Sequence, residues 1–278
     1  TLLIVFQIGV TQFCRKTATY AALFFAFAPL NLMYQSATLP DISVVFFMSV
    51  AYWVLAKYLQ NTHNKILFLV FLLAGGYCVV VKPIHFLPIG ILLITHFLQQ
   101  WRYPYVTNLS NYIIRHKTII SLFALITLTM FFWIGFQKQA HINSIYPQSW
   151  LSYPSYPHHL YDVLFYARML YRWFLMVLNP ITFLFFLLGI LLLFRDHRGD
   201  ERMALIYSII GYYLFFGYII RGHEYYVLAM VPFGSVVAGR GAVWIEERVC
   251  SDFKIRSRHV LSAAIILSTA ICSVFIFS

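Results

Sequence analysis

Residues 203–244 read MALIYSIIGYYLFFGYIIRGHEYYVLAMVPFGSVVAGRGAVW, and this stretch decides the fold class. A short polar turn, Arg221 to Tyr226, separates two apolar runs, each close to the roughly 20 residues with which a helix crosses a bilayer. The strands of a membrane barrel would alternate apolar and polar residues, whereas these runs are continuous. The stretch therefore predicts two membrane-spanning helices joined by a tight polar turn.

Similar runs recur outward from this stretch over the whole chain. Of the 278 residues, 61% are hydrophobic and only 10% are charged, which is too little charge to coat a soluble domain. We predict an all-α fold: one polytopic transmembrane bundle over residues 1–278, with about ten spans. The expected spans are 1–13, 17–34, 41–59, 65–81, 84–100, 118–136, 174–194, 203–220, 225–244 and 259–277.

The basic residues sort into two sets when the spans alternate in direction. Five lie in one set of loops: Lys82, Lys138, Arg168, Arg172 and Arg221. Fifteen lie in the other: Arg15, Lys16, Lys57, Lys65, Arg102, Arg115, Lys117, Arg195, Arg198, Arg202, Arg240, Arg248, Lys254, Arg256 and Arg258. Cytoplasmic loops carry an excess of Lys and Arg, so the larger set predicts the cytoplasmic face. The net charge of +11 is explained by this sorting, and nucleic acid is not expected as a partner.

The predicted outer face carries one long loop, residues 137–172, which is rich in Tyr, Pro, His and Ser. Its second half, 160–172, has apolar residues at helical spacing, and Arg168 and Arg172 lie four residues apart on one face. This pattern predicts an amphipathic helix on the outer membrane surface. The apolar stripe of that helix is Leu160, Val163, Leu164, Ala167 and Leu170.

The start of the chain lies inside an apolar run. Thr1 is preceded by neither an initiating methionine nor a signal-peptide pattern. We therefore expect native sequence before Thr1, including a first span and a first outer loop.

Asp41 and Lys82 are ionisable residues beside apolar runs, where such residues are often functional. Asp41 follows Pro40 at the start of a span, where it suits the helix dipole as well as a polar cavity. Lys82 ends an apolar run and precedes Pro83, so an ammonium and freed backbone groups coincide there. We expect Lys82 to act as a point charge toward an anionic headgroup. His85 follows the same break and could face the same cavity.

The densest polar cluster is the turn between the two spans quoted first. Its candidate residues are Arg221, His223, Glu224, Tyr225 and Tyr226. An interfacial belt of tyrosines explains the last two but not the Arg-His-Glu grouping. These side chains could bind phosphate, transfer protons or hydrogen-bond a sugar. They could also ligate a divalent metal, so a metal cofactor stays open, although no metal site is assigned.

Three segments of the chain resemble one known family. They are LNLMYQSATLPD (30–41), LAGGYCVVVKPIHFLP (73–88) and RGHEYYVLAMVPFGSVVAGRG (221–241). In this order they are similar to membrane glycosyltransferases of the GT-C type, near dolichyl-phosphate-mannose protein mannosyltransferases and bacterial aminoarabinose transferases. The third segment, with its His-acid-Tyr-Tyr turn before a Pro-containing span, is the most specific.

The resemblance implies transfer of a sugar, hexosyl or pentosyl, from a polyprenyl-phosphate donor to a lipid, glycan or protein acceptor in the cell envelope. It implies an integral protein of the bacterial inner membrane with an extracytoplasmic active face. Asp41, Lys82, His85 and the turn residues 221 and 223–226 would then line the donor site or its cavity. The family's catalytic acidic residue falls in a region that would precede Thr1, so no catalytic residue is assigned.

Two other functions stay open at this point. One is a transporter or flippase of polyprenyl-linked saccharides, although such proteins often show repeated halves. The other is an inactive membrane fragment, because the first outer loop of the family is missing.

Overall fold

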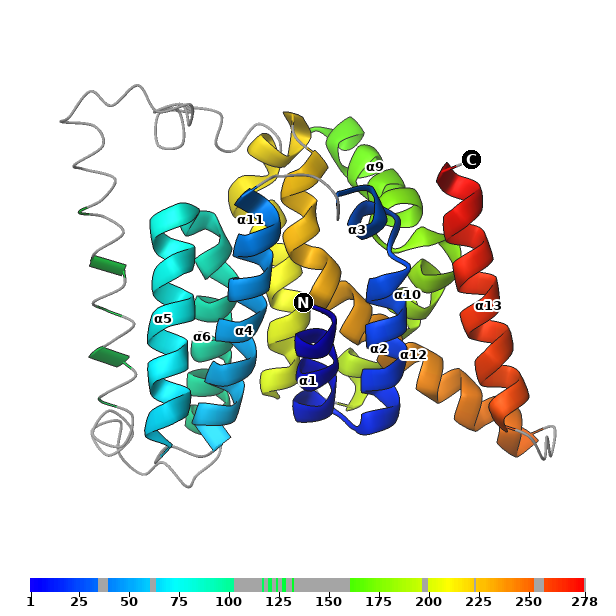
Figure 1. Cartoon of the computed structure of the whole chain (residues 1–278), viewed down its shortest axis with the longest axis horizontal. Coiled ribbons are helices and arrows are strands. Elements are labelled where there is room, and N and C mark those ends of the chain that lie inside the picture. Colours follow the sequence, from blue (N-terminus) through cyan, green and yellow to red (C-terminus); the bar gives the residue numbers. More distant parts are fainter. Residues whose placement is uncertain are drawn as a thin grey trace.

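The computed structural model describes residues 1–34, 40–60, 64–102, 161–196, 200–222, 224–252 and 258–277, with seven single positions between 117 and 132. Throughout this described part the regular structure is helical (Figure 1). The elements are α1 (Leu2–Gln12), α2 (Arg15–Ala26), α3 (Pro29–Tyr34), α4 (Pro40–Gln60), α5 (Lys65–Val81), η1 (Pro83–Phe86), α6 (Leu87–Arg102), α9 (Val163–Arg172), η3 (Trp173–Val177), α10 (Asn179–Asp196), η4 (Glu201–Met203), α11 (Ala204–Gly222), η5 (Glu224–Met230), α12 (Val231–Asp252) and α13 (Arg258–Phe277). The prediction of an all-α chain is confirmed for these residues.

Three helical segments are long and apolar enough to cross a membrane: Asp41–Gln60, Asn179–Asp196 and Tyr225–Ser251. Helix α10 also exposes a row of apolar side chains at helical spacing, and α13 does the same. The exposed residues are Leu184, Leu187, Leu191 and Phe194 on α10, and Leu267, Ile271, Val274 and Phe275 on α13. Soluble proteins rarely expose continuous apolar surfaces of this kind, so these rows indicate contact with lipid.

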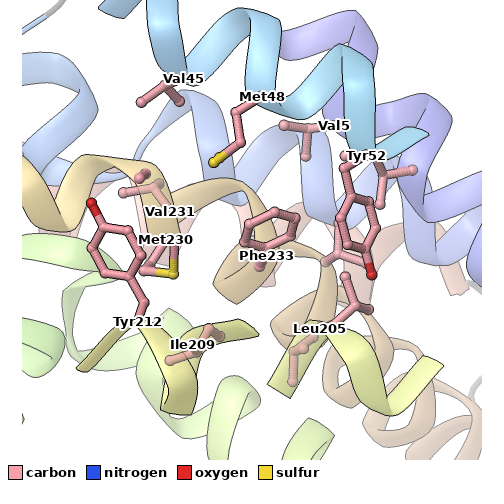
Figure 2. Packing of buried hydrophobic residues seen from close by; sticks show 14 of the residues in the cluster. Val5, Val45, Met48, Tyr52, Leu205, Ile209, Tyr212, Met230, Val231 and Phe233 are labelled. Carbon is pink, nitrogen blue, oxygen red and sulfur yellow. The ribbon is translucent and has the colours of Figure 1, made fainter. Parts of the chain in front are cut away.

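The core of the bundle surrounds α12. In the segment Tyr225–Ser251, 83% of an apolar stretch of 18 residues is buried, against 39% of such a stretch in Asn179–Asp196. Helix α12 packs mainly against α2 and α10, and the chain just before it contacts α4 and α11. Figure 2 shows side chains of α1, α4, α11 and α12 meeting around Phe233. Helix α12 is therefore a central element of the described bundle, and α10 lies nearer its surface.

Two predicted spans are interrupted, because local backbone chemistry overrides the apolar pattern. The span 17–34 is divided between α2 and α3, since Pro29 lacks the amide hydrogen that would continue the helix. The span 174–194 is divided after η3, where Asn179 adopts a positive φ of 59°. Asn tolerates this conformation better than most residues. A single continuous helix over either range was therefore a wrong prediction.

One serine of α13 joins the two interruptions. The Ser273 hydroxyl lies 2.5 Å from the carbonyl oxygen of Phe27, at the end of α2. The Asn179 side-chain amide donates to the Ser273 oxygen at 2.9 Å, and its carbonyl oxygen accepts the Thr182 amide at 3.0 Å. These bonds satisfy backbone groups that the interruptions leave free, as buried backbone in a membrane protein requires.

The other predicted spans agree with the helices to different degrees. The range 65–81 coincides with α5, 41–59 is one residue shorter than α4 at each end, and 259–277 begins one residue after α13 does. The ranges 84–100 and 225–244 each begin as a 3-10 turn, η1 or η5, before the α-helix. The range 118–136 lies largely outside the described residues.

The amphipathic helix exists as α9, but its orientation differs from the predicted stripe. Phe165 and Met169 are buried against the bundle, whereas Val163, Leu164 and Leu170 are 78%, 64% and 59% exposed. Asp162 caps the helix by accepting a hydrogen bond from the Leu164 amide at 2.9 Å. The apolar stripe of α9 therefore faces away from the protein.

The connections of the bundle gather at two opposite ends (Figure 1). The adjoining ends of α1 and α2, of α4 and α5, and of α12 and α13 lie at the lower end of that view. The α5–α6 turn, the α11–η5 turn, α3 and α9 lie at the upper end. Segments that the sequence analysis assigned to one face thus share one end of the described bundle.

Candidate functional site

Asp41 owes its position to the start of α4. Pro40 begins this helix and Asp41 lies in its first turn, where a carboxylate is stabilised by the partial positive charge of the helix N-terminus. Its residue exposure is only 2%. A carboxylate buried to this extent needs a partner, because removing an unpaired charge from water is costly.

Lys82 is brought to the same depth by the end of α5. The helix stops at Val81, Lys82 adopts φ −152° and ψ 89°, and Pro83 opens η1. The His85 amide donates to the Lys82 carbonyl at 3.0 Å, so the break keeps its backbone hydrogen-bonded. The lysine is 1% exposed, and its side chain points into the bundle. The Lys82 ammonium therefore lies inside the described bundle.

The two charges meet in an ion pair. The Lys82 ammonium donates to Asp41 Oδ1, and both side chains are at most 3% exposed. The Lys82 Nζ also lies 4.2 Å from the ring centroid of Tyr226 and 5.1 Å from that of Tyr225. Aromatic faces attract a cation at this range, most strongly where water is excluded. We call Asp41, Lys82, Tyr225 and Tyr226 the Lys82 cluster.

Neighbouring aromatic rings extend the Lys82 cluster. Tyr34, at the end of α3, meets Tyr225 edge-on with ring centroids 6.5 Å apart. Tyr225 and Tyr226 are stacked on each other at 4.7 Å. A wall of tyrosines beside a buried cation can contact a sugar ring and hydrogen-bond its hydroxyl groups.

His85 lies one turn beyond Lys82 and faces α11. Its Nδ1 is 3.2 Å from the Tyr212 hydroxyl, and both side chains are buried. Tyr212 is visible in Figure 2 at the edge of the core, beside Met230 and Val231. Sequence reasoning missed Tyr212, because a tyrosine within an aromatic-rich span carries no signal of its own.

The structure thus brings Asp41, Lys82, Tyr225 and Tyr226 together from three segments distant in sequence, and it places His85 one turn from Lys82. The side chains of Arg221, His223 and Glu224 lie outside the described residues. The expectation that these three residues line a donor site therefore stays a prediction. Among the side chains that the structure describes, no group of three or more His, Cys, Asp or Glu residues could hold a metal ion.

A second ion pair, in which only the carboxylate is buried, lies at the other end of the bundle. Glu246 of α12 is 1% exposed, accepts a hydrogen bond from the Tyr20 hydroxyl at 2.9 Å and pairs with Lys16 at 2.8 Å. This contact joins α2 to α12, and the sequence analysis did not anticipate it. Because the Lys16 side chain is 35% exposed, this pair reaches solvent, whereas the Asp41–Lys82 pair does not.

Comparison with known proteins adds no relative: no family model, curated protein or solved structure matches the chain significantly.

Proposed function

We propose that this chain is a membrane glycosyltransferase that uses a polyprenyl-phosphate-linked sugar as its donor. One observation carries the proposal: the Lys82 cluster draws a residue or a pair from each of the three segments that resemble the GT-C family. Asp41 ends the first segment, Lys82 belongs to the second, and Tyr225 and Tyr226 belong to the third. Their convergence at one end of the bundle is what a shared donor site requires.

The chemistry of the cluster suits a phosphate leaving group. A lysine ammonium stabilises the negative charge that develops on phosphate as the glycosidic bond breaks, and it does so best where water is excluded. In the Lys82 cluster a carboxylate oxygen of Asp41 occupies the anion position beside the ammonium. A donor phosphate oxygen would bind the same ammonium beside Asp41, and Asp41 would act as a positioning residue for Lys82. No catalytic base is assigned.

The membrane setting supports the same proposal. The donor's hydrocarbon tail needs a bilayer, and the described chain has three helices long and apolar enough to cross one. We further propose that the Lys82 cluster lies at the extracytoplasmic face of an inner membrane, within a bundle of about ten spans. The sorting of fifteen against five basic residues supports this orientation. Its acceptor would be a lipid, glycan or protein on that face.

The proposal is tested by donor binding in a variant that removes both charges at once. Asp41→Asn with Lys82→Met leaves no unpaired ion, so the double variant avoids the destabilisation that a single buried charge would cause. We expect polyprenyl phosphate to bind the purified double variant at least tenfold more weakly than wild type. The matched control is Lys16→Met with Glu246→Gln, which removes the pair at the other end and should bind as wild type does. Equal affinity of wild type and the Asp41/Lys82 variant would refute the donor site.

One observation favours the transporter alternative. Transporters place their sites at discontinuous helices, and α2–α3 and η3–α10 are both interrupted. Sugar release separates the two functions: a transferase liberates free polyprenyl phosphate from a sugar-loaded donor when acceptor is present, whereas a transporter moves the intact donor across vesicles without cleaving it.

A further inference from the structure

The two helix interruptions enclose an apolar pocket at the end of the bundle that carries α3 and α9. Its volume is about 360 Å³, and it is lined by Pro29, Leu30, Met33, Tyr171, Leu175, Met176 and Ile276. These residues come from α3, α9, η3 and the end of α13. Apart from the Tyr171 hydroxyl, the lining side chains are apolar. A pocket with such walls takes a hydrocarbon chain and excludes a polar headgroup.

The mouth of the pocket lies at the surface of the protein. Met33 and Tyr171 are 47% and 61% exposed although they line it. Helix α9 beside it turns Leu164 and Leu170 outward, which suits a helix lying within the membrane interface. A tyrosine at this boundary is also typical of interfacial belts. Bilayer lipid is therefore the surrounding medium from which an occupant would come.

A positive charge lies one helical turn from Tyr171, an exposed residue of the pocket lining. Arg168 is exposed and lies one helical turn before Tyr171 and Arg172, so it shares their side of α9. Arg172, at the end of the same helix, is half-buried. A cationic residue within a helical turn of an apolar pocket is complementary to a lipid with an anionic headgroup and one chain in the pocket.

We propose that this pocket binds an anionic phospholipid of the surrounding bilayer, with one acyl chain among α3, η3 and α13 and its headgroup phosphate at Arg168. Occupation would brace the two helix interruptions that Ser273 joins, since Leu30 and Met176 line the pocket directly beside them. The pocket is distinct from the Lys82 cluster, because Tyr34 of α3 packs on Tyr225 while Met33 faces the pocket. The inference does not depend on the proposed transfer reaction.

Native mass spectrometry of the purified chain, with added phosphatidylglycerol or phosphatidylcholine of the same acyl chains, tests the proposal. We expect wild type to retain phosphatidylglycerol in preference to phosphatidylcholine. Arg168→Gln should weaken phosphatidylglycerol retention about fivefold, since one cation near an anionic lipid surface contributes about that factor. It should leave phosphatidylcholine unchanged. Met33→Trp, which fills the pocket, should weaken retention of both lipids.

The control is Lys65→Gln, which removes another exposed charge at the far end of the bundle and should behave as wild type. Circular dichroism and thermal unfolding verify that each variant is folded. If Met33→Trp does not fold, Arg168→Gln still decides the test. Equal retention of both lipids by wild type would overturn the proposal. Retention of phosphatidylglycerol by Arg168→Gln at the wild-type level would also overturn it. Displacement of the phosphatidylglycerol by equimolar polyprenyl phosphate would assign the pocket to a donor tail and would equally overturn it.

Discussion

At the residue scale, we expect removal of one charge of the Lys82 cluster to cost more stability than removal of both. Asp41 and Lys82 are both almost completely buried, so removing one leaves an unpaired ion in the bundle. Breaking a buried ion pair typically costs about 3–5 kcal/mol, whereas replacing both members by neutral residues is often close to neutral. We therefore expect Asp41→Asn alone to lower the thermal unfolding midpoint in detergent much more than Asp41→Asn combined with Lys82→Met. A single variant as stable as wild type would contradict the pairing.

At the element scale, the close approach of α10 and α12 depends on glycine. A Cβ added at Gly189 would lie 2.0 Å from the Val237 carbonyl oxygen, and one added at Gly241 would lie 2.1 Å from that of Phe185. Backbone atoms cannot move aside cheaply, so the two helices would have to separate. The sequence analysis did not anticipate this role of Gly241, which lies inside α12.

We expect Gly189→Ala to destabilise the protein by more than 2 kcal/mol, because overpacking of rigid backbone costs about 1–3 kcal/mol or more. The matched control is Gly76→Ala in α5, where an added Cβ meets nothing within 4 Å. Alanine there should raise stability by up to about 1 kcal/mol, since glycine disfavours a helix interior. Denaturation of the two variants in the same detergent measures the difference, and similar effects at both sites would argue against the packing of α10 on α12.

At the scale of the whole molecule, the proposed orientation in the membrane can be tested by labelling one thiol. Cys14 is exposed in the connection between α1 and α2. Partial burial raises the pKa of the Cys14 thiol, but hydrogen bonds from Thr17 and Lys16 and the charge of Arg240 outweigh burial and lower that pKa below its ordinary value. More thiolate is then present near neutral pH, so maleimides should react quickly with it.

We expect a membrane-impermeant maleimide to label Cys14 in inside-out vesicles and not in intact cells, with Cys78, Cys250 and Cys272 replaced by alanine. The matched control adds Tyr161→Cys to a chain without Cys14. This position is 81% exposed beside α9 and should label from the opposite side. Labelling of both positions from one side would reject the predicted topology.

The sequence alone determined the features that depend on neighbouring residues. The length of an apolar run and its flanking polar residues gave the bounds of α5 and nearly those of α4 and α13, because helix ends are set by local capping. The same reasoning marked Asp41, Lys82, His85, Tyr225 and Tyr226, since ionisable and polar groups beside apolar runs stand out without any fold.

Only the tertiary structure decided the partners of these residues. Lys82 meets an aspartate 41 positions away, and His85 meets a tyrosine 127 positions away, distances over which no sequence pattern operates. The interruption at Asn179 and the outward face of α9 depend equally on what packs beside them, Ser273 in one case and the bundle surface in the other. Helix identity is a local property of the chain, whereas burial and pairing of polar groups are set by contacts that form only when the helices assemble.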